Sequence, residues 1–163
     1  MSFGEVSDYQ GAEGMTDVIV EGFDVYIKVY NDTGAAVTNG DVFFLGFAVD
    51  ADSLDPSTYF TLDALATSAI YRQIVVVNNR ILGKATIGDT EWGYVQVRGY
   101  CPDVSITAAS VAKSRYLQGK NATATLEDDG TTITTDSCAV AVGAVFSTTH
   151  VPALLFGYRT IIG

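Results

Sequence analysis

The sequence predicts an all-β fold: one β-sandwich or barrel domain of jelly-roll-like character over residues 18–163, preceded by an extended N-terminal arm over residues 1–17, with at most one short helix. The composition favours strands, because Gly (16), Tyr (9) and Phe (8) are plentiful, as are Val and Thr. Short apolar runs alternate with turn residues at intervals of about 8 to 12 residues, which is typical of sandwiches and barrels. A chain of 163 residues is long enough to bury the core of one domain.

The first 17 residues differ from the rest of the chain. They contain three glycines and scattered apolar side chains that follow neither the period of a strand nor that of a helix. Such a segment cannot bury itself and becomes ordered only against a partner. The sequence therefore predicts an arm whose isolated apolar residues are the candidate partner-binding residues: Phe3, Val6, Tyr9 and Met15.

Two strands and a helix are predicted in the next part of the chain. Residues 24–31 alternate between apolar and polar, which indicates a half-buried strand. Residues 42–49 (VFFLGFAV) are nearly all apolar, which indicates a strand buried on both faces, and Gly46 inside it predicts a bulge or a bend. Asp55 before a proline favours a short helix over residues 55–66, although the same residues also suit a strand.

The remainder reads as a series of short strands. Residues 70–77 and 80–86 are predicted to form a hairpin around a two-residue turn at Asn78-Asn79. Residues 91–98 alternate again, and Asp128-Asp129-Gly130 is predicted to be a turn. Further strands are predicted at 103–107, 114–118, 122–127, 131–135, 138–146 and 154–162.

Charge is distributed unevenly along the chain. The first 63 residues hold twelve acids and one base, Lys28, whereas the remaining 100 hold seven acids and eight bases, for a net charge of -10. This asymmetry disfavours nucleic acid and anionic membranes as partners and suits a basic protein surface, a cation or open solvent. Only 17% of the residues are charged, below the roughly 25% of ordinary soluble domains. The low fraction predicts that other copies of the chain cover part of the surface.

The search for catalytic residues finds no convincing set. His150 is the only histidine, and no serine lies in a nucleophile-elbow motif, so a triad of His150 with Ser147 and Asp136 is not predicted. A solvent-facing loop histidine is predicted instead. Asp89 and Glu91 share one side of a strand as a glycosidase pair does, but they neighbour a turn and are predicted to be solvated charges.

No cofactor or metal is predicted. Cys101 and Cys138 lack the spacing of a zinc site and are predicted to be buried thiols, while a disulfide between them depends on geometry that the sequence does not give. The loop with Asp50, Asp52 and Asp55 departs from the calcium-binding pattern at its glycine and glutamate positions. Calcium binding by this loop is left open. The first residues also lack the basic start and apolar core of a secretory signal.

One stretch resembles a known class of proteins. Residues 92–101 (WGYVQVRGYC) are followed by a short strand at 104–106, by VAKSRYLQ at 111–118 and by AVAVGAV at 139–145. This order resembles the β domains of small virion structural proteins of tailed phages, the head decoration or cement class. The earlier AVTNGDV at 36–42 resembles a turn that is common there.

The resemblance implies a non-enzymatic protein made in the host cytoplasm that binds the outside of a phage head and stabilises it. It implies two partners: the major capsid protein, and further copies of the chain, as a homotrimer most often and a dimer in other cases. An alternative from another class is a carbohydrate-binding or adhesin-type module with Trp92 and tyrosines as its platform. An exposed Trp92 beside Tyr94 is what that alternative predicts.

Overall fold

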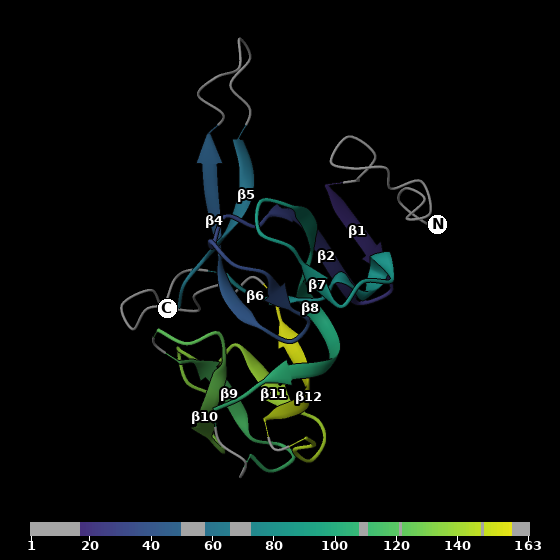
Figure 1. Ribbon diagram of the computed structural model, residues 1–163. Helices are drawn as coiled ribbons and strands as arrows, with labels where there is room; N and C mark the ends of the chain where they lie inside the picture. Colours follow the sequence, from purple (N-terminus) through teal and green to yellow (C-terminus); the bar gives the residue numbers. More distant parts are fainter. Residues whose placement is uncertain are drawn as a thin grey trace.

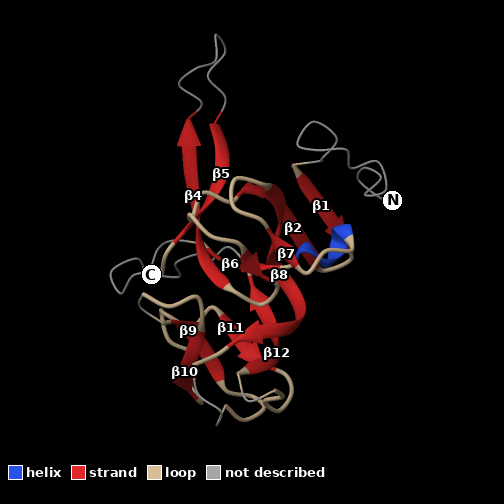
Figure 2. Cartoon of the chain, in the orientation of Figure 1, coloured by secondary structure: helices blue, strands red, loops and turns tan. Residues whose placement is uncertain are grey.

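The computed structural model describes residues 17–49, 58–65, 73–107, 111–120, 122–147 and 149–157. This part of the chain is all-β and contains no α-helix, which confirms the predicted fold class (Figures 1 and 2). A single 3-10 helix is present in it, η3 (Asn79–Leu82). The strands are β1 (Val18–Glu21), β2 (Asp24–Tyr30), β3 (Val37–Thr38), β4 (Val42–Val49), β5 (Thr58–Asp63), β6 (Ile74–Val77), β7 (Thr86–Ile87), β8 (Trp92–Ser105), β9 (Tyr116–Gly119), β10 (Leu126–Gly130), β11 (Ala139–Ala141) and β12 (His150–Phe156).

Five strands close into a ring, which we call the first barrel. The order β2-β5-β4-β6-β8 returns to β2, because β2 pairs with both β5 and β8. The β2–β5 contact is parallel at Tyr30 and Thr61, and the other pairings are antiparallel. Closure removes free sheet edges and encloses a core. The buried side chains of that core are Val29, Val37, Phe43, Leu45, Leu62, Val75, Val77, Ile87, Val95 and Val97.

The long strand β8 carries the chain into a second ring. Its first half pairs with β2 and its second half pairs with β12, after which the order continues through β11 and β9 to β10. A parallel bridge between Ile106 and Leu126 joins the end of β8 to β10 and closes what we call the second barrel. Gly99, at φ +99°, lies where β8 passes from one barrel to the other, and this backbone conformation favours glycine.

The two barrels share a packed boundary. On β4, Phe43 and Leu45 point into the first barrel, whereas Val42 and Phe44 belong to the core of the second. The apolar run at 42–49 is therefore buried on both faces over its first half, as predicted. The second core also contains Leu65, Val76, Cys101, Val104, Ile106, Val111, Leu117, Leu126, Cys138, Ala139, Ala141, Val151, Ala153 and Leu155.

The predicted helix over 55–66 is wrong in its described part. Thr58–Asp63 forms β5, because each of its residues pairs with one of β4. The spacing of apolar residues in this segment fits both a helix and a strand, and pairing with β4 selects the strand. Gly46 also marks no bulge, since the β4–β5 register runs through it without a shift. A Cβ at Gly46 would lie 2.6 Å from Oγ1 of Thr61 and also against the Asp63 carboxylate, so a larger residue requires these two side chains to move.

The predicted hairpin around Asn78-Asn79 is wrong. Asn79 starts η3, and its buried side chain donates to the Thr86 carbonyl at 2.8 Å and accepts from the Tyr94 amide at 3.1 Å. Asn79 thus forms hydrogen bonds with backbone groups of the loop that follows it. The strand predicted over 80–86 is reduced to the two residues of β7. Asn79 therefore stabilises this region through its side-chain hydrogen bonds and not by adopting a hairpin-turn conformation.

Two predictions near residue 130 are also wrong. Asp128 and Gly130 belong to β10 and are separated by a bulge, so they form no turn. Residues 131–135 form bends in place of a strand, because the hydroxyl groups of Thr134 and Ser137 both donate to the Asp129 carboxylate. These local hydrogen bonds compete with a sheet ladder. The predicted strands at 138–146 and 154–162 are found as β11 and β12, with shifted bounds.

The predicted N-terminal arm has only its last residue in the described part. Asp17 accepts a hydrogen bond from the Lys28 amide through its carbonyl at 2.9 Å, and its carboxylate pairs with Lys28 Nζ at 2.7 Å. β1 then begins at Val18. The arm therefore stays a prediction, as does the start of the β domain at residue 18.

Candidate partner-binding surface

The hairpin of β4 and β5 projects from the first barrel (Figure 1). The two strands pair over six positions, from Phe44–Asp63 at the barrel to Val49–Thr58 at the outer end. The other neighbour of β4, β6, pairs only with residues 42–44 of that strand. The outer half of the hairpin therefore extends past the strands that form the barrel.

An apolar face runs outward along this hairpin. Phe43, Leu45 and Phe47 point to the same side of β4, because side chains alternate along a strand. The first two are buried in the barrel, whereas Phe47 is 68% exposed. Its direct partner on β5 is Phe60, with ring centroids 5.3 Å apart at an interplanar angle of 51°. The core face of the barrel thus continues onto solvent as a pair of aromatic rings.

The surroundings of this pair are acidic by sequence. The connection between β4 and β5 contains Asp50, Asp52 and Asp55, which lie outside the described residues together with residues 1–16. The calcium question for that loop and the anchors Phe3, Val6, Tyr9 and Met15 therefore lie outside them too. Within the described ranges, no group of three or more His, Cys, Asp or Glu side chains is arranged to hold a metal ion.

The sequence placed the candidate partner-binding residues in the arm and did not single out Phe47. A signal for it was present. The apolar run at 42–49 has eight residues, and an acidic, proline-containing loop follows it at once. In the structure β6 pairs only with residues 42–44 of this strand. Phe47 lies beyond that pairing and is exposed.

Trp92 belongs to an aromatic cluster at the end of the first barrel. Its ring lies 5.4 Å from that of Tyr30 and 5.6 Å from that of Tyr59, and the planes are tilted by 60° in each case. Lys28 Nζ lies 5.0 Å from the centroid of the Trp92 ring. Trp92 is therefore partly buried among tilted rings, with a lysine ammonium beside it. Tyr94, the expected companion of Trp92, is buried beside Ile19 and Tyr26.

His150 lies at the start of β12 and is partly buried, so the prediction of a solvent-facing loop histidine is wrong. Pairing of β12 with β8 places it opposite Ser105, whose Oγ is 3.2 Å from His150 Nε2. Asp103 approaches the same nitrogen at 3.6 Å, while Nδ1 faces Thr149 Oγ1 at 3.1 Å. A Ser–His–Asp relay needs the serine and the acid on opposite ring nitrogens. The arrangement lacks that geometry.

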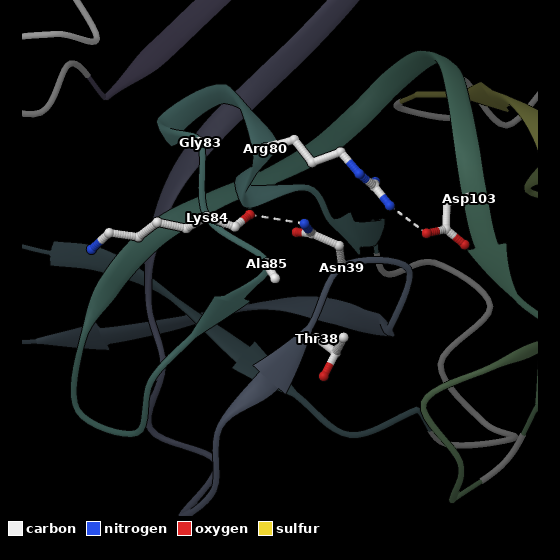
Figure 3. A pocket seen from close by; sticks show the side chains of 7 residues that line it. All are labelled: Thr38, Asn39, Arg80, Gly83, Lys84, Ala85 and Asp103. Carbon is white, nitrogen blue, oxygen red and sulfur yellow. Dashed lines mark hydrogen bonds and ion pairs between the residues drawn. The ribbon is translucent and has the colours of Figure 1, made fainter.

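A shallow depression of about 450 Å³ lies beside this cluster (Figure 3). Two charged residues of its rim are paired, since Arg80 donates to the Asp103 carboxylate. Asn39 Nδ2 donates to the Lys84 carbonyl at 2.9 Å across its floor. Nearby, burial raises the pKa of Asp41, whose carboxylate accepts from the Thr38 amide at 2.8 Å. These polar groups stabilise the junction between the barrels.

The other residues considered for chemistry have structural contacts. The Asp89 carboxylate accepts from the Gly34 amide at 3.1 Å, and that of Glu91 accepts from the Gly88 amide at 3.2 Å, so both stabilise turns. Cys101 and Cys138 are buried thiols, as predicted, and the geometry that the sequence left open holds them as free cysteines. Burial raises the pKa of Cys101 to about 11.

No helix in the described ranges is long and apolar enough to cross a membrane. Comparison of the chain with protein-family models, with curated proteins and with solved structures finds no match.

Proposed function

We propose that this chain is a non-enzymatic adhesive protein of the phage head decoration class, which binds the outside of a capsid lattice and stabilises it. The observation that carries the proposal is the projecting β4–β5 hairpin with Phe47 68% exposed at its side. An aromatic side chain on a firmly paired strand loses little conformational freedom when it binds, which makes it an effective anchor.

The expected mechanism is burial of Phe47 in an apolar pocket of the major capsid protein. Burying the exposed two thirds of this side chain contributes about 2 kcal/mol, or about thirty-fold in Kd. That is modest for one copy. Copies arranged around a symmetry axis of the lattice add avidity, because each later contact is intramolecular. Adhesion across neighbouring capsomers then opposes outward pressure on the shell.

The acidic third of the chain contributes long-range attraction. Twelve acids against one base within residues 1–63 attract a basic lattice surface. Such attraction is screened within about 8 Å at physiological ionic strength, so association should slow and weaken as monovalent salt rises. An affinity that stays constant across the salt series, measured with a chelator present, would leave the acids with solubility alone.

Co-sedimentation tests the proposal. Undecorated heads are assembled from the major capsid protein encoded in the same genome as this chain, and the bound fraction is titrated. The Phe47→Ala variant should bind about thirty-fold more weakly. Phe23→Ala is the matched control, since Phe23 is 79% exposed but lies on the turn between β1 and β2. Absence of binding by the unmodified chain, or equal loss in the two variants, contradicts the proposal.

A further inference from the structure

A second apolar surface lies on the outer side of the second barrel. The pairs Tyr100–Leu154, Leu154–Val140 and Val140–Tyr116 run in one row across β8, β12, β11 and β9. Directly paired residues of antiparallel strands point to the same side of a sheet. Their sequence neighbours Leu117, Ala139 and Leu155 are buried in the core, so the row faces outward. Tyr100 is 50% exposed and Leu154 is 41% exposed.

The row is the centre of a wider apolar face. Pro152 and Phe156 lie two residues to either side of Leu154 on β12, and their side chains therefore point outward as well. The Phe156 ring lies 6.2 Å from that of Tyr116. Val142, two residues after Val140, is 37% exposed. We call this set the outer face: Tyr100, Tyr116, Val140, Val142, Pro152, Leu154 and Phe156.

The outer face is as large as the apolar patches that often have a function on monomers. Four strands about 4.8 Å apart and seven residues at about 3.3 Å each span a face of about 20 by 20 Å, on the order of 400 Å². The largest apolar patches on monomers reach about 300–600 Å² and are often functional. Two such faces cover on the order of 800 Å², and their rims bring the total near the 1,000 Å² of a specific interface.

The charge distribution favours a second copy as the occupant. Residues 98–157, which contain the outer face, hold five acids and four bases, whereas the acids of the chain concentrate in residues 1–63. Two copies of net charge -10 repel each other, and contact through the nearly neutral part minimises this repulsion. A face that covers the same face of a second copy is related to it by a two-fold axis, whereas a trimer requires two different patches.

We propose that two copies of the chain dock through their outer faces, sheet against sheet about 10 Å apart, to form an isologous dimer. The contact is independent of the hairpin through which we propose that the protein binds a capsid. Near the lower limit of specific interface area, dissociation constants on the order of micromolar are expected.

Sedimentation equilibrium of the full chain from 1 to 200 µM tests this dimer. The unmodified chain should pass from monomer to dimer over this range. Leu154→Asp and, as a second variant, Tyr100→Ser should remain monomeric at 200 µM, because each places a polar group at the centre of the row. Phe47→Ser, on the opposite barrel, is the control and should dimerise normally. Circular dichroism checks that each variant is folded. We expect the Leu154 and Tyr100 variants to fold, because both side chains are exposed in the single chain.

Three outcomes overturn the proposal. One is an unmodified chain that is monomeric throughout, and another is a trimer. The third is normal dimerisation of folded Tyr100→Ser and Leu154→Asp, which places the contact elsewhere. If a monomeric chain begins to dimerise when residues 158–163 are deleted, the outer face is covered by the chain's own C-terminal segment and not by a second copy.

Discussion

Gln96 gives the sharpest test of how β8 joins the two barrels. Its side chain is fully buried, although the strand alternation at 91–98 places it with Trp92 and Arg98. The Oε1 atom accepts from Asn78 Nδ2 at 2.9 Å. The Nε2 atom donates to the Arg98 carbonyl at 3.1 Å and to the Tyr100 carbonyl at 3.0 Å. These contacts bridge the bend around Gly99.

Replacement of Gln96 by leucine removes all three hydrogen bonds at similar volume. The buried Asn78 amide that loses its acceptor costs about 2–3 kcal/mol, and the two part-buried carbonyls cost about 1–1.5 kcal/mol each, or about 5 kcal/mol together. The added apolar burial of leucine offsets about 2 kcal/mol of this. The variant should therefore lose about 3 kcal/mol of unfolding free energy. For a chain of this length, that loss lowers Tm by about 6–12 °C.

Urea unfolding followed by the fluorescence of Trp92, the only tryptophan, measures this difference at one fixed protein concentration. Gln118→Leu is the matched control. Gln118 lies on β9, is only partly buried and donates to Glu127 at 3.1 Å, so its replacement should change stability by less than about 0.5 kcal/mol. A Gln96→Leu variant as stable as the unmodified chain would show that the bend does not depend on these hydrogen bonds.

Two further predictions concern titratable groups. Two hydrogen bonds from the Arg115 guanidinium, at 2.8 and 2.9 Å, hold the pKa of Asp128 below its usual value. Because the folded-state pKa is lowered, the stabilisation is present above the ordinary carboxylate pKa and is lost as the pH falls through the lowered one. Asp128→Asn should therefore be less stable than the unmodified chain at pH 7, with a smaller difference at pH 3; equal unfolding free energies at pH 7 would contradict this. Burial raises the pKa of Cys101 to about 11, so neither it nor the buried Cys138 should react with a thiol reagent at pH 8 until the chain unfolds in urea; labelling of the folded protein within minutes would mean that the second barrel opens readily.

The sequence by itself determined the fold class and several strands. Alternation at 24–31 and the apolar run at 42–49 correspond to β2 and β4, because burial against a core imposes these patterns on any strand in such positions. Burial of the two cysteines was also predicted, because free cysteine is among the most buried residue types. The resemblance to phage decoration proteins gave a function that remains a proposal.

Tertiary structure decided what depends on which strands become neighbours. Thr58–Asp63 is a strand because β4 offers it a partner, and His150 has Ser105 beside it because β12 pairs with β8. The outer face exists only because strand pairing brings Tyr100, Leu154, Val140 and Tyr116 into one row. The order of residues along a strand determines which side chains lie on each of its two faces. Which of those faces remains exposed depends on ring closure, since closure assigns one face to a core and leaves the other without cover.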